Sequence, residues 1–598
     1  MRMGPMPMDA MPTDAGGPRT LTAVLRHNLA TAPDRPAVYL LSPKQPDQAL
    51  SFRALMEGAA GYANAFAAAG VEPGEVVVLI LQHGQDLIFA FWGAVLAGAI
   101  PSIMPFLTEK LSPEKYRQEM AALVEITRPA AVVTSPEFAP EVQAAMGAGT
   151  RTLPRVVLTS EVDGGQAPHG GQALHGGQAP ADLAALPGVL RSPDDLVLLQ
   201  HSSGTTGLQK GVALSHQAVL NQIDCYAAAI RLSPDDVVVS WLPLYHDMGL
   251  IAGFVMPILR QAPLVLMSPF DWVRAPYRLL QAVTRYHGTL TWLPNFAYNF
   301  CAQKIRDRDL AGVDLSSWRA VINCSEPMRW ESQQAFAQRF AAFGLRPGAM
   351  ATCYAMAENV FAVTQGGMDG PVVVDAIERR ALIAGQAVSR ALREAAGAPD
   401  LADAPDAVTM LSAGRPLPNV RLRVLDEQRR ELPERRVGEI ALRSDCMLTG
   451  YYNRADLTAL AFYDGWYLTG DLGYLAEGEL FVTGRKKDLI IVGGKNVHPQ
   501  DLEALAGEVP GVHPGRAVAF GVFDEELGTE EVVIVAEADS ETDDERSRLA
   551  DQVRQCVNRG SDIAVRVVQI VVPRWVLKTS SGKLARAANR EKYLAEFQ

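Results

Sequence analysis

The chain has 598 residues, of which 48% are hydrophobic and 20% are charged, and its formal net charge is -12. This length is too great for one hydrophobic core, so at least two domains are expected. The composition is that of a soluble globular protein, and the acidic balance without a long basic run argues against nucleic acid as the main partner. Six scattered cysteines form no C-x-x-C pair, which argues against a zinc or disulfide framework and favours a cytoplasmic location.

The N-terminal segment is rich in Met, Pro and Gly but has no apolar signal-peptide core. We therefore predict a flexible leader over residues 1–19. The most apolar run extends from Leu87 to Ile100, which is short of the ~20 residues needed to cross a bilayer. It predicts a buried helix capped by Asp86, and no membrane span is expected.

Helix-like and strand-like runs alternate from Leu21 to about Ser160. A helical pattern follows Thr20 as its cap, and buried strands are predicted at 75–81 and 130–134. Such alternation predicts an α/β fold in which helices cover a parallel sheet.

A period-six repeat, GGQAPH-GGQALH-GGQAP, interrupts this alternation at 164–180. It predicts a flexible glycine-rich surface insertion over about 163–180. A metal site at His169 and His175 is the less favoured interpretation, because two histidines on a glycine tether lack further ligands.

A glycine-rich loop follows the apolar strand pattern at 196–199. The loop, QHSSGTTGLQKG at 200–211, contains three glycines, four hydroxyl side chains and one lysine. Glycines allow close approach of the backbone to a ligand, and hydroxyls, backbone N–H groups and a lysine suit phosphate oxygens. The loop is therefore predicted to bind phosphate; an exposed Ser/Gly loop is the alternative. It is not a Walker A loop, because Gly211 follows Lys210.

The α/β pattern resumes at Asp195 and continues to about Phe361. One or two helices are predicted over 375–396, then a loop over 396–407, and then strands at 420–425 and 438–442. The last ~110 residues, with strands at 488–492, 517–522 and 531–536 and helices from Asp501 and near 546–558, predict a separate small α+β domain.

Seven further motifs occur in order behind the glycine-rich loop: SWLPLYHDMGL at 240–250, WLPNFAYNF at 292–300, INCSEPM at 322–328, CYAMAE at 353–358, GWYLTGD at 465–471, GRKKDLIIVGGKN at 484–496 and KTSSGKLAR at 578–586. Their order and spacing resemble the adenylate-forming superfamily from about residue 20 onward. The style of the motifs is most similar to fatty acyl-AMP ligases, as is the long segment at 359–413, which resembles the place of an insertion in those enzymes.

The resemblance implies a large N-terminal domain of several subdomains over 20–486 and a mobile C-terminal lid domain over 487–598. It also implies two half-reactions with ATP and Mg²⁺ as cofactors. A carboxylic acid, expected to be a medium- or long-chain fatty acid, becomes acyl-AMP, and the acyl group then moves to the phosphopantetheine thiol of an acyl carrier protein acting in trans. The alternatives are an acyl-CoA or aryl-CoA synthetase that uses coenzyme A, and a non-catalytic relative, against which the intact motifs argue.

The resemblance also implies the residues of the nucleotide site. Lys583 matches the catalytic lysine of the superfamily, and Glu358 matches the acidic residue associated with Mg²⁺. Asp471 matches the residue that binds the ribose hydroxyls, and Arg485 is expected to assist in that binding. The phosphate loop supplies Ser202, Ser203, Gly204, Thr205, Thr206 and Lys210. The adenine side is expected to comprise Ser325, Glu326, Cys353, Tyr354, Ala355 and Met356, with the ring of Tyr354 against the base.

His246 is expected to act at the entrance for the acyl chain or the thiol, and Lys487 matches the hinge of the lid. The acyl pocket is expected to comprise His246, Met248, Gly249, Phe254, Asn295, Phe296 and Ala297. For its apolar members, ordinary core packing is the alternative. Asn359 departs from the usual alanine of the motif, which leaves open an unusual carboxylic acid as substrate.

Overall fold

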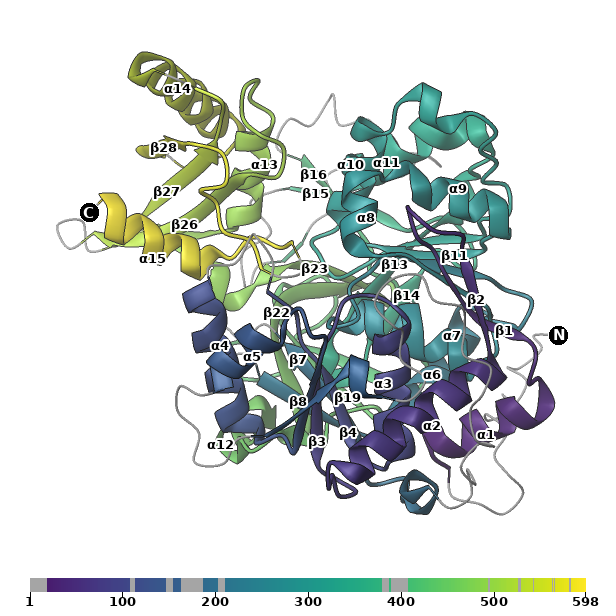
Figure 1. Cartoon of the computed structure of the whole chain (residues 1–598). Coiled ribbons are helices and arrows are strands. Elements are labelled where there is room, and N and C mark those ends of the chain that lie inside the picture. The colour runs from purple at the N-terminus through teal and green to yellow at the C-terminus, as the bar shows by residue number, and fades with distance from the viewer. Residues whose placement is uncertain are drawn as a thin grey trace.

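The computed structural model of the chain describes residues 19–107, 113–146, 154–162, 186–202, 210–378, 387–388, 407–492, 495–524, 529–540, 542–561, 563, 565–579 and 582–597. The mixed α/β class expected from the sequence is confirmed, with a large N-terminal and a small C-terminal domain (Figure 1). The predicted leader, except Arg19, and the glycine-rich repeat at 164–180 lie outside the described residues.

The first sheet is parallel, as predicted, and has the strand order β4-β3-β5-β6. Its strands and the first helices of the chain are β3 (Val76–Ile80), β4 (Ile100–Ile103), β5 (Ala131–Thr134), β6 (Arg155–Leu158), α1 (Leu21–Thr31), α2 (Phe52–Ala68), α3 (Gln85–Leu96), α4 (Pro113–Thr127) and α5 (Ala139–Met146). Thr20 caps α1 by accepting a hydrogen bond from the Ala23 amide at 3.2 Å. The predicted cap of α3 is wrong: Gly84 is its N-cap, and Asp86 accepts a hydrogen bond from the Tyr62 hydroxyl instead.

The second sheet has nine strands in the order β17-β14-β13-β12-β11-β9-β10-β1-β2. Their bounds are β1 (Pro36–Leu40), β2 (Gln48–Ser51), β9 (Val238–Ser240), β10 (Leu264–Leu266), β11 (Leu290–Leu293), β12 (Ala320–Asn323), β13 (Met350–Ala355), β14 (Ala362–Gly366) and β17 (Arg415–Pro416). Strands β9, β11, β12 and β13 are neighbours and parallel. Parallel strands end at one edge of a sheet, so the four motifs that follow them are brought together there.

The helices that accompany this sheet are α6 (His216–Ala229), the π-helix η3 (Met248–Val255), α7 (Met256–Leu259), α8 (Pro269–Arg274), α9 (Tyr277–Tyr286), α10 (Asn295–Lys304) and α11 (Trp330–Phe340). One hydrophobic core runs through this sheet and the helices around it. Trp92, Trp272, Trp292 and Trp318 are among its fully buried side chains.

Two smaller sheets complete the large domain. One contains β18 (Val420–Leu425), β19 (Gly438–Ser444), β21 (Phe462–Tyr463), β22 (Trp466–Ala476) and β23 (Glu479–Arg485); the other contains β7 (Leu196–Ser202), β8 (Lys210–Ser215) and β20 (Gly450–Tyr451), which is followed by α12 (Ala455–Ala461). The predicted helix is wrong where it begins, because β15 (Val374–Glu378) pairs with β16 (Ala407–Leu411). There the Asp375 carboxylate is buried in an ion pair with Arg435, a tertiary contact that the local pattern does not reveal.

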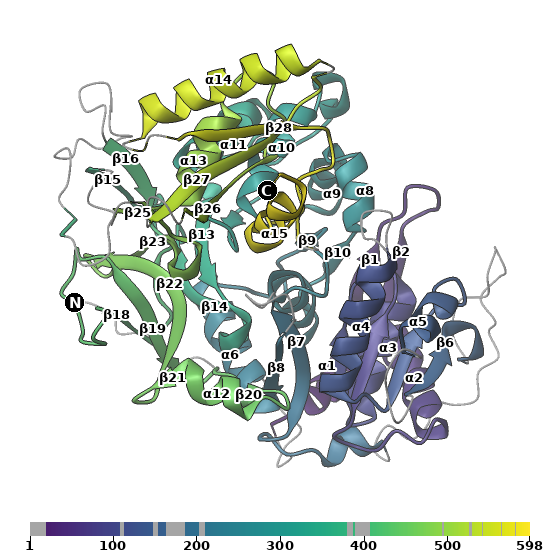
Figure 2. The same cartoon turned by 90° about the vertical axis from the view of Figure 1, so that its left-hand side faces the viewer.

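The C-terminal domain is the small α+β unit that the sequence predicts. It contains β24 (Ile490–Val492), β25 (Lys495–Val497), α13 (Pro499–Gly507), β26 (Ala517–Asp524), β27 (Thr529–Glu537), α14 (Asp543–Gly560), β28 (Val567–Val571) and α15 (Arg586–Phe597). Side chains alternate along β26: Ala517 and Ala519 join the core under α13 and α14, and Val518 and Phe520 join a second core under α15. Figures 1 and 2 show this domain at one end of the molecule. Its boundary at 486/487 stays a prediction.

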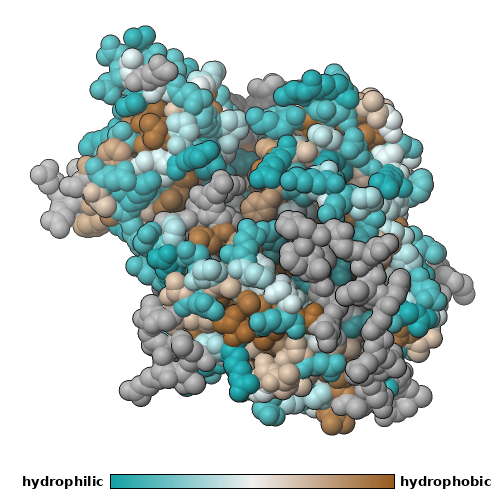
Figure 3. Space-filling view, in the orientation of Figure 1, coloured by the Kyte–Doolittle hydropathy of each residue, from teal (hydrophilic) through white to brown (hydrophobic). Residues whose placement is uncertain are grey.

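The surface in the view of Figure 3 is mostly hydrophilic, with separate hydrophobic patches. In the part of the chain that the structure describes, no helix combines the length and the apolar character needed to cross a bilayer.

Candidate active site

Asp471 and Arg485 face each other across the β22–β23 ladder at the edge of the candidate site. The Arg485 Nε lies 3.1 Å from the Asp471 carboxylate, and the Tyr354 hydroxyl donates a hydrogen bond of 2.6 Å to the same carboxylate. The nearby Asp471 charge raises the pKa of Arg485, which keeps the guanidinium protonated. The three residues assigned to the nucleoside by sequence are thus in direct contact. The carboxylate that they surround can accept hydrogen bonds from further hydroxyl groups.

Glu358 lies in η7 (Ala357–Asn359), directly after β13. Its side chain is buried, and the Tyr451 hydroxyl donates a hydrogen bond of 2.9 Å to its Oε1. Burial raises the pKa of this carboxyl, and the bond from Tyr451 lowers it. The next turn is strained: Val360 has a φ of 62°, which a β-branched residue rarely adopts, and its carbonyl accepts a hydrogen bond from Gln200 in β7.

The phosphate-binding prediction falls mainly outside the described residues. Ser203, Gly204, Thr205 and Thr206 are not among them, and only the backbone of Ser202 is described. Ser202 pairs with Lys210 across the β7–β8 ladder. The Lys210 ammonium lies over the ring of Tyr451, 4.8 Å from its centre, on the same side of the large domain as Glu358.

Lys583 reaches the site from the segment between β28 and α15 of the C-terminal domain. In this segment the Thr579 amide donates to the Lys583 carbonyl, and the Gly582 amide donates to the Thr579 carbonyl; Gly582 has a φ of 86°. A side-chain carbon on Gly582 would lie 3.9 Å from the Phe296 ring. The positive charge of Lys583 reaches three partly buried groups of the large domain. Desolvation has the largest influence, lowering the pKa of His246 and raising the pKa of Asp247 and Glu326, and the Lys583 charge acts to lower all three.

His246 and Asp247 precede the π-helix η3, and single π turns in proteins are frequent at functional sites. Burial and the nearby Lys583 lower the pKa of His246 to about 3, so the imidazole is neutral at physiological pH. Its Nε2 is buried without a hydrogen-bond partner. The Asp247 carboxylate accepts a hydrogen bond from the Met248 amide, and burial raises its pKa. Gly249 is required here, since a side-chain carbon would lie 2.2 Å from the Pro243 carbonyl.

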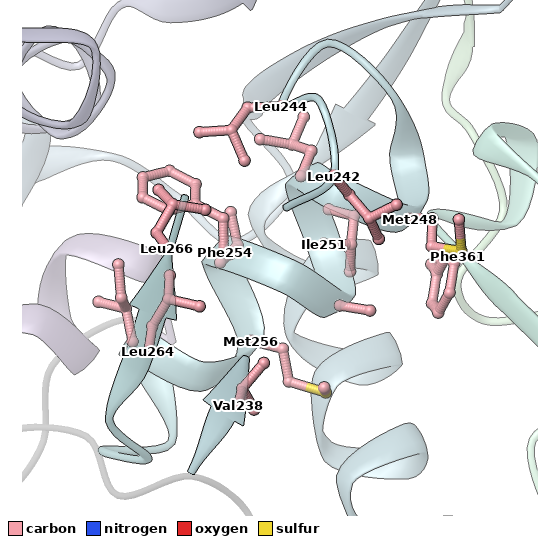
Figure 4. Close-up of a cluster of buried hydrophobic side chains, with 14 of the residues drawn as sticks. Val238, Leu242, Leu244, Met248, Ile251, Phe254, Met256, Leu264, Leu266 and Phe361 are labelled. Atoms are coloured by element: carbon pink, nitrogen blue, oxygen red, sulfur yellow. The ribbon is translucent and has the colours of Figure 1, made fainter. Parts of the chain in front are cut away.

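The residues predicted for the acyl pocket lie in the described core around β9, η3 and α10. Figure 4 shows Met248 and Phe254 among buried aliphatic side chains. Phe254 packs against Phe91 and Trp92, whereas Phe296 packs edge-on against Trp241 and Trp272. Ala297 is fully buried. Their role in holding an acyl chain stays a prediction.

Asn295 is engaged by the protein itself. Its amide donates to Ser332, and its oxygen accepts hydrogen bonds from the Asn323 side chain and the Arg329 amide. These bonds fix the loop after β12 against α10. A positioning role for Asn295 is therefore better supported than direct contact with an acyl chain.

The expected adenine side follows β12 and β13. Ser325 has a φ of 70°, a strained conformation for a residue with a side chain, and Glu326 accepts a hydrogen bond from the Phe296 amide at 3.0 Å. Cys353 is buried beneath the site, Ala355 ends β13, and the Met356 amide donates to the Phe361 carbonyl. The loop with Ser325 and the turn with Met356 thus lie at the ends of neighbouring strands.

Lys487, the predicted hinge, lies in η10 (Lys486–Asp488) at the end of β23. Burial and the charge of Arg485 lower its pKa, and Lys210 contributes in the same direction. The hinge position therefore lies within electrostatic range of both the ribose side and the phosphate side. Rotation of the C-terminal domain at this residue stays a prediction.

A Mg²⁺ ion fits this site as a partner of ATP phosphates. Among the described residues, no group of three or more His, Cys, Asp or Glu side chains could hold a metal ion alone. Mg²⁺ commonly uses one or two carboxylates together with substrate phosphates. Glu358 is buried and Asp247 is partly buried, and the Asp247 charge helps to raise the pKa of Glu358, an arrangement that a cation would stabilise.

Several residues of the site were missed from the sequence. Tyr451 and Tyr467 join hydroxyls at 3.0 Å beside Glu358, and Arg329 donates to the Gln500 carbonyl of the C-terminal domain. The only sequence signal for the contact between Tyr451 and Tyr467 is the presence of a tyrosine in each of the segments TGYY and GWYL. Asn359 is explained differently from the sequence-based interpretation: it is fully buried and bonded to the Ala362 carbonyl and Ser444. Its polarity serves the fold and gives no support for an unusual substrate.

Comparison with known proteins agrees with this arrangement. The family described as AMP-binding enzyme matches residues 25–452. The chain belongs to this family. The long-chain-fatty-acid–AMP ligase FadD26 of Mycobacterium marinum is 29% identical over 609 residues, covering 97% of this chain and 98% of the relative. The medium-chain-fatty-acid–[acyl-carrier-protein] ligase JamA of Moorena producens is 32% identical over 418 residues, covering 67% of this chain and 68% of the relative.

A solved structure from work on fatty acyl-adenylate ligases of E. coli and L. pneumophila has the same fold. It is 26% identical, with a TM-score of 0.83, and covers 98% of this chain and 100% of that one. This AMP-binding enzyme is thus an ATP-dependent acyl-AMP ligase of the adenylate-forming superfamily.

Proposed function

We propose that this acyl-AMP ligase activates a medium- or long-chain fatty acid and transfers it to the phosphopantetheine thiol of an acyl carrier protein. Such a product would enter lipid, polyketide or lipopeptide synthesis. The names of JamA and FadD26 support the acid class, and that of JamA supports the carrier. The observation that carries the proposal is that Gly582, next to Lys583, lies against Phe296 of the large domain, where an added side-chain carbon would be 3.9 Å from the ring. This brings the charge of Lys583 within range of His246 at the site that also holds the Asp471–Arg485 ion pair.

In the first half-reaction, a carboxylate oxygen attacks the α-phosphorus of ATP, and the bond from that phosphorus to pyrophosphate breaks. Both reactants are anions, so positioning and positive charge supply most of the acceleration. Lys583 would stabilise the charge that develops between carboxylate and α-phosphate. Asp471 would hold the ribose, and Tyr354 and the segment from Ser325 would face the adenine. Lys210 and the loop at 202–206 would hold the leaving group, and Glu358 would hold Mg²⁺, which neutralises the phosphate charge.

In the second half-reaction, a thiol sulfur attacks the acyl carbon and AMP leaves. The neutral His246, with its unpartnered Nε2, would lie beside this path and orient the thiol or the acyl carbonyl. Lys583 must leave before a pantetheine arm can enter, which requires rotation of the C-terminal domain near Lys487.

The test supplies ATP, Mg²⁺ and fatty acids of graded length, and measures pyrophosphate release. Acyl transfer is then followed with holo-carrier protein or with coenzyme A as acceptor. We expect pyrophosphate release with medium and long chains and faster loading of the carrier protein. Rapid formation of acyl-CoA at physiological coenzyme A would contradict the proposed acceptor and identify an acyl-CoA synthetase.

A further inference from the structure

Tyr451 lies where three parts of the candidate site meet. Its backbone pairs with Val212 in β8, the strand that begins at Lys210, and its ring lies under the Lys210 ammonium. Its hydroxyl donates to Glu358 and contacts the Tyr467 hydroxyl at 3.0 Å, on the strand that carries Asp471. Phosphate side, metal side and ribose side are therefore joined at one side chain.

The surroundings favour a functional explanation of this junction. Tyr451 is 6% exposed and Glu358 is 8% exposed, so a hydrogen bond between them is shielded from water. Hydrogen bonds to a charged group contribute more than neutral ones, and their geometry is specific. The bond to Oε1 fixes the direction in which the Glu358 carboxylate points.

The contact with Lys210 uses another part of the same side chain. Lys210 and Val212 lie on the same face of β8, and Val212 is the partner of Tyr451, so the lysine can reach diagonally across the ring. An ammonium over an aromatic face is attracted by the negative charge of the ring face. The ring thus holds Lys210 close to Glu358 before any phosphate binds.

We propose that Tyr451 is a positioning residue for ATP: its hydroxyl orients Glu358 toward the metal–phosphate group, and its ring holds Lys210 toward the leaving pyrophosphate. The inference rests on the proposed function, because it takes Glu358 and Lys210 as ligands of Mg²⁺ and phosphate. The proposal assigns the orientation of Glu358 to the hydroxyl and the position of Lys210 to the ring. Removing the hydroxyl and removing the ring should therefore affect ATP binding differently, which a tyrosine that only fills space would not predict.

The experiment measures ATP binding by titration calorimetry in the full chain carrying Lys583→Ala, so that no turnover occurs. Tyr451→Phe removes the hydroxyl and keeps the ring, and Tyr451→Leu removes both. Each is titrated with ATP in excess Mg²⁺ and with ATP in EDTA. Tyr452→Phe is the matched control, since it loses a hydroxyl one residue further on that makes no hydrogen bond recorded in the described structure.

We expect Tyr451→Phe to raise the Kd for Mg-ATP about tenfold and to change the Kd for metal-free ATP less than twofold, as the loss of one charge-assisted hydrogen bond predicts. Tyr451→Leu should weaken binding under both conditions, and Tyr452→Phe should bind like the parent. Equal weakening of Tyr451→Phe with and without Mg²⁺, or none, would overturn the proposal. A parent chain that binds no ATP, or an unmutated chain that releases no pyrophosphate, would instead contradict the proposed function.

Thermal unfolding of the same variants separates positioning from folding. Tyr451→Phe should keep the Tm of the parent within a few degrees, because the ring and its packing remain. In the chain that keeps Lys583, Tyr451→Phe should raise the KM for ATP more than it lowers kcat. A fall in kcat alone would overturn the positioning role.

Discussion

On the nucleotide side of the site, side chains of the large domain hold one another: Asp471 contacts Tyr354 and Arg485, and Glu358 accepts a hydrogen bond from Tyr451. Lys583, in contrast, comes from the segment before α15 in the C-terminal domain. The first group is fixed in place by partners on either side. The second depends on how one domain rests on the other. The difference separates two tasks: the large domain binds ATP in a prepared site, and the small domain supplies the charge that starts the reaction.

The largest expected effect is that of Lys583→Ala. Removing one charge that stabilises a transition state typically slows a reaction about 100- to 1,000-fold, so we expect a loss of that size in pyrophosphate release. ATP binding should persist, because the nucleotide side belongs to the large domain. The matched control is Arg590→Ala, an exposed cation on α15 of the same domain. Pyrophosphate release by Lys583→Ala at the unmutated rate would refute the assigned role.

The second prediction concerns the nucleotide side of the site, in the large domain. Asp471→Asn removes the charge that pairs with Arg485 and accepts from Tyr354, and it places amide hydrogens beside those donors. We expect the KM for ATP to rise about tenfold or more, with a smaller change in kcat, since a charge-assisted hydrogen bond contributes to binding before chemistry. Asp464→Asn, in the exposed turn before β22, is the control. An unchanged KM with a large fall in kcat would move Asp471 from binding to the chemical step.

The same contrast explains what the sequence could predict. The alternation of strands and helices, the parallel first sheet and the α+β C-terminal domain follow from local periodicity, and the structure confirms them. Failures occurred where a distant partner decided the outcome. Asp375 lies in a strand because Arg435 and β16 lie beside it, and Asn359 is polar because Ser444 and Ala362 bind it.

In the candidate site, too, the sequence predicts some features and not others. Motifs carry residues such as Asp471 and Lys583, but a motif does not show what orients each residue. Tyr451 is 93 positions from Glu358, and Arg329 is 171 positions from Gln500. Local spacing contains no sign of such contacts, because strand order and domain contact create them.

The third prediction concerns the contact between the domains and has the smallest expected effect. Arg329 Nη2 donates to the Gln500 carbonyl at 2.8 Å and lies 3.6 Å from the Asp501 carboxylate, while Gln500 donates to Thr483. In this orientation Lys583 faces the site. Loss of about 1 kcal/mol from these partly exposed contacts would shift the balance between domain orientations about fivefold.

We therefore expect Arg329→Ala to slow single-turnover pyrophosphate release about three- to tenfold and to leave transfer from preformed acyl-AMP to holo-carrier protein unchanged or faster. Arg339→Ala, in α11, serves as the control, because Arg339 contacts Asp307, the Ile305 carbonyl and the Phe340 ring, all within the large domain. Equal slowing of both half-reactions would contradict a role of the Arg329 side chain in domain orientation, because the backbone amide that donates to Asn295 is retained in the variant. Selective slowing of the first step would show that the position of Lys583, unlike that of Asp471, depends on a contact made and broken in each cycle.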